Sequence, residues 1–267
     1  MNYAPVAALL KGLKVLEAVN ALGPASLRQI QEATDLPKAT TLRLLETLCY
    51  AGYLSVSPET HRYVVTARVL ALSNNYQPNE ALWSVARPIM ESLRGKTGWP
   101  SDLAIYQHGK MVISDTNRQP GTLSVNRSVG SRVPVTKTAL GRAYLAFCPD
   151  AEREDIISFL KESGDQEEEL AHDPDWLAGL VEQVRAQGYA TSNQELVKTI
   201  RAVAVPVKQD EAVICTFNLI VTAQAVSFKE LKQKYVPLLQ SAAQEMTSRV
   251  SGQSANENAE TRKLSSP

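Results

Sequence analysis

The sequence has few cysteines and histidines. Its 267 residues include three of each, and neither set has the local spacing of zinc ligands. An odd number of scattered cysteines argues against a disulfide framework and is typical of a reducing compartment. We therefore expect no metal site, no cofactor and no disulfide.

The chain also lacks net charge and long apolar runs. Its 28 Lys and Arg residues balance 28 Asp and Glu residues, which argues against a uniformly basic coat but allows a local DNA-binding face. No stretch approaches the roughly 18 apolar residues of a membrane helix. Residues 1–5 lack the features of a signal peptide. Composition predicts a soluble, cytoplasmic protein without a membrane partner.

Signatures of catalysis are missing as well. Gly95, Lys96 and Thr97 resemble the end of a phosphate-binding loop, but Met90 stands where the first glycine is required. The chain has no Gly-x-Ser-x-Gly turn. We expect no catalytic residues, and an enzyme or a plain metabolite-binding protein is the alternative class.

The N-terminal third has the pattern of a winged helix-turn-helix. Leucines recur at helical spacing over residues 9–22, and Ser26 with Gln29 forms a capping-box pattern for a second helix. A third helix is expected over residues 37–50, followed by a β-hairpin over residues 53–65. In this arrangement the second helix of the helix-turn-helix pair enters the major groove.

The helix expected at 37–50 carries small polar and basic side chains opposite its leucines. Short hydroxyls reach phosphates or bases there, and an arginine such as Arg43 can pair bidentately with guanine. Arg62 lies near the hairpin tip, where a wing contacts the DNA. The predicted DNA-binding residues are Arg28, Lys38, Thr40, Thr41, Arg43, Thr47 and Arg62. A helical oligomerisation module is the alternative interpretation.

Helices and strands mix in the rest of the chain. The expected helices are 80–96, 138–147, 150–163, 174–187 and 227–250, and the expected strands are 103–106, 110–115, 122–126, 202–207 and 213–221. The many acids of residues 150–175 favour a solvated helical face over a metal site. Residues 251–267 are polar, and we expect them to be disordered.

Several segments carry a family resemblance. The sequences LKVLEA at 13–18, SLRQI at 26–30, LPKATTLRLL at 36–45 and GYL at 52–54 resemble the DNA-binding domain of the IclR family of bacterial transcription regulators. The sequences VGSRVPV at 129–135, TALGRAYLAF at 138–147, GYA at 188–190 and RAVAVPV at 201–207 resemble its effector domain. The resemblance covers roughly residues 9–250, in order.

This resemblance implies an α+β protein. A winged helix-turn-helix DNA-binding domain would occupy residues 1–66, a linker helix 67–79, and a GAF/profilin-like α/β effector-binding domain 80–250, before the tail at 251–267. It also implies a homodimer or homotetramer on palindromic operator DNA, with RNA polymerase as a further partner. An effector would control transcription allosterically, through a coupling of about 1–3 kcal/mol between the two sites.

Three segments are similar to a narrower group, the regulators of aromatic-acid catabolism such as those for hydroxyphenylpropionates. These segments are 99–102, 123–127 and 217–219. The effector of a catabolic operon regulator would then be an aromatic carboxylic acid, and a small aliphatic acid is the alternative. The effector itself, the operator, activation against repression, and dimer against tetramer are left open.

Effector sites of this kind lie in concave, mostly apolar pockets. The resemblance places the loop before the 138–147 helix beside the pocket, where amide groups and Lys137 could hold a carboxylate. Asn218 and Ile220 stand where the family often has two serines, which favours a ligand with an apolar body. Asn193 stands where several members carry an acid.

Trp99 could stack on an aromatic ring, with ordinary packing as the alternative. Arg127 could anchor a carboxylate or only brace its loop, whereas Arg132 is expected to brace the loop or the dimer. The predicted effector-binding residues are Trp99, Ser101, Asp102, Arg127, Lys137, Thr138, Ala139, Asn193, Ile200, Ala202, Asn218 and Ile220.

Overall fold

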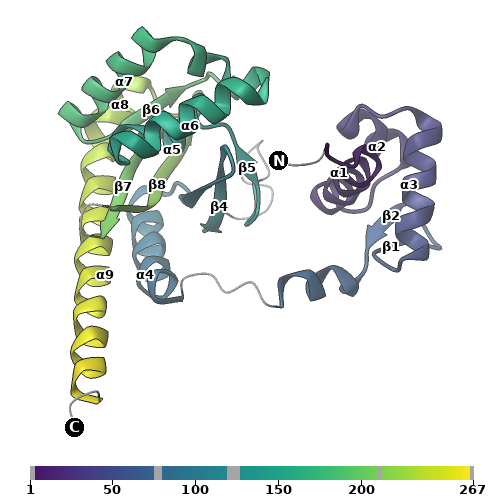
Figure 1. The fold of residues 1–267 in the computed structure, drawn as a ribbon, viewed down its shortest axis with the longest axis horizontal. Coiled ribbons are helices and arrows are strands. Elements are labelled where there is room, and N and C mark those ends of the chain that lie inside the picture. The colour runs from purple at the N-terminus through teal and green to yellow at the C-terminus, as the bar shows by residue number, and fades with distance from the viewer. Residues whose placement is uncertain (1–3, 75–79, 119–126, 210–211, 265–267) are drawn as a thin grey trace. The chain divides into compact units, whose positions relative to one another are not determined.

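The computed structural model describes residues 4–74, 80–118, 127–209 and 212–264 of the chain. The chain divides into two compact units, Met1–Gln77 and Pro78–Pro267 (Figure 1). The linker helix expected over residues 67–79 is represented by a 3₁₀ helix, η1 (Ala67–Ser73), and residues 75–79 lie outside the described ranges.

The first unit has the predicted order of elements. These are α1 (Ala7–Leu22), α2 (Leu27–Thr34), α3 (Lys38–Tyr50), β1 (Leu54–Val56) and β2 (Tyr63–Val65). The capping box of α2 is confirmed, because the Ser26 hydroxyl accepts from Gln29 N and Gln29 Oε1 accepts from Ser26 N. Strands β1 and β2 pair antiparallel, with Leu54 opposite Val65. This unit is a winged helix-turn-helix.

A small apolar core holds these elements together. Its fully or nearly fully buried members are Val15, Val19, Ala25, Ile30, Leu45 and Leu54. Leu42, expected on the same side of its helix as Leu45, is 36% exposed. Helix α1 buries its valines, whereas Leu9, Leu10 and Leu13 face outward.

The second unit is built on an antiparallel sheet with the strand order β5-β4-β3-β8-β7-β6. The strands are β3 (Asp102–Gln107), β4 (Lys110–Thr116), β5 (Arg132–Val133), β6 (Ala190–Asn193), β7 (Ile200–Gln209) and β8 (Ala212–Thr222). The strand expected at 122–126 lies outside the described residues. Edge strands β5 and β6 are additions that the sequence did not predict.

Helices cover both faces of this sheet (Figure 1). One face packs against α4 (Glu80–Thr97) and α9 (Val236–Leu264), and the other packs against α5 (Ala139–Phe147). Neighbouring strand residues alternate between the two cores, since side chains in a strand point to opposite faces. Leu103 and Leu219 therefore lie on the α4–α9 side, and Ala104 and Ile220 on the α5 side.

The remaining helices cover the outer side of α5 and lead into α9. They are α6 (Asp150–Ser163), η2 (Gln166–His172), α7 (Pro174–Gln187), α8 (Phe228–Glu230) and the short π-helical segment η3 (Leu231–Tyr235). Helix α9 continues to Leu264, so the structure differs from the expected disorder after residue 250. The packed part of α9 supplies the nucleus that a helix needs, and the Ala, Glu and Gln residues that follow favour its continuation.

Candidate functional sites

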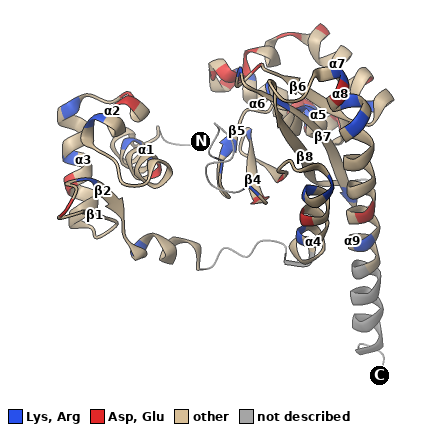
Figure 2. Ribbon diagram, turned by 180° about the vertical axis from the view of Figure 1, so that it is seen from behind, with Lys and Arg blue, Asp and Glu red and all other residues tan. Residues whose placement is uncertain are grey.

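Helix α3 presents polar and basic groups on the surface of the first unit. Lys38, Arg43 and Thr47 are exposed, and Thr40 is half-buried. Figure 2 shows basic residues on α2 and α3. A shallow hollow between α1 and α3 is lined by Ala8, Lys11, Thr40, Arg43, Leu44 and Thr47. Thr40, Arg43 and Thr47 share one face of α3, and Lys38 lies in its first turn. Cations and hydroxyls in these places suit contact with a phosphate backbone and with base edges.

Thr41 does not belong to this surface, so the prediction that it contacts DNA is wrong. It is fully buried, and its hydroxyl donates to the Pro37 carbonyl oxygen at 3.1 Å. Helical spacing carries the reason, because Thr41 precedes Leu45 by four residues and Leu48 by seven and so shares their inner face.

The two outlying arginines are exposed and differ in their partners. Arg28 Nε pairs with Glu32 Oε1 at 2.8 Å on α2, and this pair partly neutralises its charge. Arg62 Nη1 donates to the Pro24 carbonyl oxygen at 3.2 Å, which holds the hairpin against the start of α2. Both guanidinium groups remain at the surface, where a phosphate can reach them.

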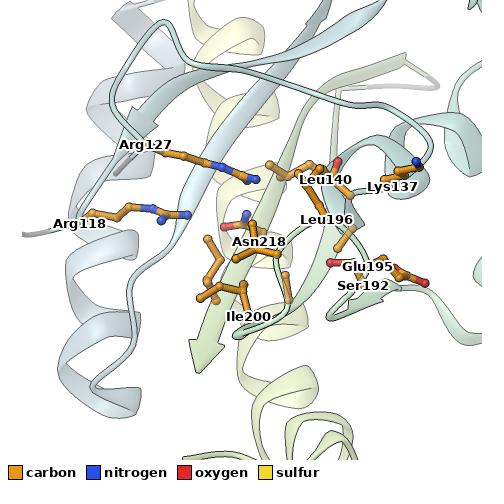
Figure 3. A pocket seen from close by; sticks show the side chains of 14 residues that line it. Arg118, Arg127, Lys137, Leu140, Ser192, Glu195, Leu196, Ile200 and Asn218 are labelled. Carbon is orange, nitrogen blue, oxygen red and sulfur yellow. The ribbon is translucent and has the colours of Figure 1, made fainter. Parts of the chain in front are cut away.

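The second unit encloses a pocket between its sheet and the start of α5 (Figure 3). About 460 Å³ of space lies inside it, including the part open to solvent. Its lining is Arg118, Arg127, Lys137, Thr138, Ala139, Leu140, Ser192, Glu195, Leu196, Val197, Ile200, Ala202, Asn218 and Ile220. Seven of these fourteen residues are apolar and seven are polar or charged, which suits a small molecule with an apolar body and a charged group.

The structure brings eight predicted effector residues together in this lining. They are Arg127, Lys137, Thr138, Ala139, Ile200, Ala202, Asn218 and Ile220. Arg118, Leu140, Ser192, Glu195, Leu196 and Val197 also line the pocket and were not predicted. Leu140 lies in α5 and Ser192 in β6, whereas Arg118 follows β4 and the other three belong to the 194–199 loop. The sequence carries no local signal for the folding of that loop or of the β4 end toward the pocket.

The other four predicted effector residues do not line the pocket. Trp99 packs against the core between the sheet and α4, and Asn193 accepts a hydrogen bond from Arg201 Nε at 2.8 Å. Ser101 and Asp102 are fully buried, one layer behind the lining. Full burial makes the prediction of direct ligand contact wrong for Ser101 and Asp102. Trp99 and Asn193 lie outside this lining, and ligand contact by these two residues stays a prediction.

Asp102 instead fixes two groups of the lining. Its carboxylate receives both Arg118 Nε at 2.8 Å and Arg118 Nη2 at 2.7 Å. The Thr116 hydroxyl donates to Asp102 Oδ1 at 2.7 Å. Asn218 Oδ1 accepts from the Asp102 amide at 2.7 Å. Because an unpaired buried charge is costly, this satisfied network holds Arg118 and Asn218 in place.

Most charges around the pocket have partners within the protein. Arg118 pairs with Asp102, Lys137 Nζ with Glu169 Oε1 at 3.0 Å, and Glu195 Oε2 with Arg142 Nη1 at 2.8 Å. Figure 3 shows Arg118 and Arg127 at one end of the pocket and Glu195 at the other.

Arg127 differs from these charges. Burial lowers its pKa, against the attraction of Asp102, and no hydrogen-bond partner acts on it among the described residues. An arginine remains protonated at neutral pH despite such a shift. Within the described part of the chain, Arg127 is therefore a lining cation without a bonded counter-charge, which suits a single carboxylate.

The loop before α5 is held by a buried acid, Glu168 of η2. It is 1% exposed and accepts from the amides of Val135 and Thr136 at 2.8 and 2.9 Å and from Lys110 Nζ at 3.1 Å. Glu168 is thus an exception to the solvated acidic face expected over residues 150–175. The bracing matters for the site because this loop leads into Lys137 and Thr138.

The described residues contain neither a membrane-spanning helix nor a cluster of metal ligands. None of their helices combines the length and apolar character required to span a membrane. Nor do any three of their His, Cys, Asp and Glu side chains gather into a set suited to a metal ion.

Comparisons with known proteins agree with this two-unit architecture. A model of the IclR helix-turn-helix domain matches residues 8–58, and a model of the C-terminal domain of bacterial IclR transcriptional regulators matches residues 75–248. The Pca regulon regulatory protein of Pseudomonas putida is 28% identical over 247 residues, covering 91% of this chain and 84% of that protein.

Two other proteins extend the comparison. The HTH-type transcriptional regulator TsaQ1/TsaQ2 of Comamonas testosteroni is 34% identical over 203 residues, covering 75% of this chain and 72% of its own length. The crystal structure of an IclR family transcriptional regulator from Brucella abortus superimposes with a TM-score of 0.61 at 27% identity, covering 91% of this chain and 92% of that one.

Proposed function

The chain belongs to the IclR family of bacterial transcriptional regulators, and on that premise we propose that it controls a catabolic operon in response to an aromatic monocarboxylic acid. Helix α3 binds the operator, with Lys38, Thr40, Arg43 and Thr47 toward the DNA. The acid binds in the pocket of the second unit and changes the affinity for the operator.

Arg127 is the observation that carries this proposal. Arg118, Lys137 and Glu195 already have partners of opposite charge, whereas Arg127 has none bonded to it in the described part of the chain. A single carboxylate would balance its charge. A guanidinium can also receive a carboxylate through two parallel hydrogen bonds, which fixes the orientation of the ligand.

The pocket walls support an aromatic body for the ligand. Leu140, Ile200 and Ile220 present branched side chains to the space beside Arg127. Burial of a flat ring between such side chains contributes favourable free energy in proportion to the apolar area removed from water. Asn218 Oδ1 is already an acceptor for the Asp102 amide, so it has limited capacity for a second polar ligand group.

Exposed apolar residues support pairing of two copies. Leu9, Leu10 and Leu13 of α1 are 62%, 55% and 47% exposed, and Leu70 and Leu72 of η1 are 67% and 65% exposed. Patches of this kind mark protein interfaces, and a twofold dimer places two copies of α3 against the halves of a palindrome. We propose RNA polymerase as a further partner at the promoter.

The test measures binding of the full-length protein to DNA upstream of its own gene and the neighbouring genes. Fluorescence anisotropy at two salt concentrations is recorded with benzoate, phthalate, phenylpropionate and aliphatic acids. Specific, salt-sensitive binding that a benzoate or phenylpropionate shifts would support the proposal. If aliphatic acids alone shift the operator affinity, the effector is aliphatic and not aromatic. Absence of specific DNA binding would refute the role of α3.

Two matched variants test the pocket. Arg127→Met keeps the stem of the side chain and removes its charge, and we expect a loss of acid affinity of about tenfold or more, the scale of a charge-assisted hydrogen bond. Arg132→Met is the control, because that exposed guanidinium only donates to the His108 carbonyl oxygen. Equal acid affinity in the two variants would remove Arg127 from the site.

A further inference from the structure

The end of strand β4 contacts two different parts of the second unit through alternate residues. Asp115 and Asn117 bond to α4, through Arg87 Nε at 2.8 Å and the Met90 carbonyl oxygen at 2.9 Å. Thr116 and Arg118 bond to Asp102, behind the pocket. Alternation is the rule in an extended segment, where successive side chains point to opposite sides.

Asn117 uses all of its polar groups to join β3 to α4. Its backbone N–H donates to the Ser101 carbonyl oxygen at 3.2 Å, and its side-chain Oδ1 accepts from the backbone N–H of Ser101 at 2.7 Å. Its Nδ2 donates to the Met90 carbonyl oxygen, and its own carbonyl oxygen accepts from Arg94 Nη1 at 2.6 Å. With 8% of its surface exposed, Asn117 has little room to move independently of these partners.

The bonds that join Ser101, Asn117 and α4, called the junction below, lie one residue away from residues of the pocket region. Arg118 follows Asn117 in the chain, lines the pocket and holds Asp102. Asp102 follows Ser101 and is also held by Asn218, a second lining residue. A ligand that displaces Arg118 or Asn218 therefore acts on both neighbours of the Asn117–Ser101 pair.

Two features indicate that the junction can change. Helix α4 contains Pro88, which cannot donate the backbone hydrogen bond that supports a helix at this point. The Ser101 hydroxyl is buried and has no hydrogen-bond partner among the described residues. Buried polar groups are normally satisfied, so a small shift that gives this hydroxyl a partner would be favourable.

We propose that Asn117 is a positioning residue that transmits ligand binding from the pocket to α4. The acid moves Arg118 and Asp102, and Asn117 passes the displacement to α4 at Met90 and Arg94. Helix α4 is the first helix after the segment that joins the two units. This inference rests on the proposed function, because it concerns regulation through the same pocket.

The first experiment separates transmission from ligand binding. Asn117→Asp keeps the acceptor for Ser101 and removes the donor to Met90, and Arg94→Met removes the other bond to α4 while keeping its stem. We expect both variants to bind the acid within about twofold of the unaltered protein. The ratio of operator affinities with and without acid should fall toward one, from the 5–150-fold range typical of allosteric coupling.

A retained ratio in both variants would overturn the inference. Arg132→Met is the control, and its ratio should match that of the unaltered protein. The ratio is informative because a purely structural role would lower stability and acid binding without separating the two affinities.

The second experiment needs no ligand, so it tests the transmission route even where the proposed effector is wrong. Amide hydrogen exchange is measured on the full-length protein carrying Arg118→Met. We expect exchange in α4 from Met90 onward to accelerate several-fold, since opening free energies are local properties of packed elements. In Asn117→Asp, adding Arg118→Met should cause little further change there. Unaltered exchange of α4 in Arg118→Met would refute the transmission route.

Discussion

The two units place their polar chemistry differently. In the first unit, Lys38, Arg43 and Thr47 lie on the surface of α3, above a core of apolar residues. In the second unit, Asp102 and Glu168 are buried and bonded within the interior. A surface group can be lost without disturbing the fold, whereas a buried charge supports it. Substitutions of the exposed residues of α3 should therefore change DNA binding, and substitutions of Asp102 or Glu168 should change stability as well.

The largest expected effect tests the buried side of this contrast. Asp102→Asn removes the carboxylate charge that pairs with Arg118, whose side chain is only 7% exposed. Breaking a buried pair in this way costs about 3 kcal/mol or more of the free energy of unfolding. Urea unfolding together with hydrogen exchange should show the loss in the second unit, while exchange in α1–α3 stays unchanged.

Asp155→Asn serves as the control for this prediction, because Asp155 is exposed on α6. Its effect should stay within about 0.5 kcal/mol, as for most surface changes. Equal destabilisation by the two substitutions would contradict the importance that we give to the Asp102 network.

The second prediction concerns the surface of α3. Arg43→Ala should weaken specific operator binding by about 1–3 kcal/mol if the guanidinium reads a base. The free energy of unfolding and the acid affinity should not change, because Arg43 has no part in either core. Anisotropy titrations and calorimetry measure the two affinities. A simultaneous loss of acid binding would contradict the independence of the two sites.

A third prediction compares two threonines on α3. Thr41→Val should cost about 1 kcal/mol of stability, because the buried hydroxyl loses its bond to the Pro37 carbonyl oxygen. Thr47→Val should leave stability unchanged and weaken DNA binding, since Thr47 is exposed. Thermal unfolding and anisotropy on both variants check this. The opposite pattern would reverse the assignment of inner and outer faces.

The smallest effect is a pH dependence confined to the second unit. A hydrogen bond from Lys110 lowers the pKa of Asp165 below its ordinary value, opposed in part by burial. A depressed pKa contributes stability that is present above the unfolded value of about 3.9 and is lost as the pH falls through the folded value. Stability should therefore decline below about pH 4.

Asp165→Asn should remove part of that decline, as measured by urea unfolding from pH 3 to pH 6. An unchanged pH profile in Asp165→Asn would show that the Lys110 pair contributes no measurable stability.

Local signals predicted the first unit well. Ser26 with Gln29 marks the start of α2, and the spacing of Leu45 and Leu48 defines the inner face of α3. Thr41 precedes Leu45 by four residues, so the same helical spacing also assigns Thr41 to the inner face, where the structure has it. These features depend on neighbours three to seven residues apart, which a sequence displays directly.

The pocket was predicted less completely, because its members come from distant segments. Arg127, Lys137 and Asn218 were predicted as effector contacts; all three line the pocket, and their contact with an effector stays a prediction. The sequence did not indicate Arg118 or Glu195. Both residues are positioned by charged partners from other elements. Arg118 pairs with Asp102 of β3, and Glu195 pairs with Arg142 of α5.

The sequence by itself therefore determined the family, the order of elements in the first unit and most of the exposed face of α3, because helical and strand periodicities are local properties of the chain. Only the tertiary structure decided that Asp102 stands behind the pocket, that Glu168 is buried, and that Arg127 has no bonded partner among the described residues. The physical reason is that the fate of a charge depends on which distant groups fold against it, and burial makes that choice costly to change.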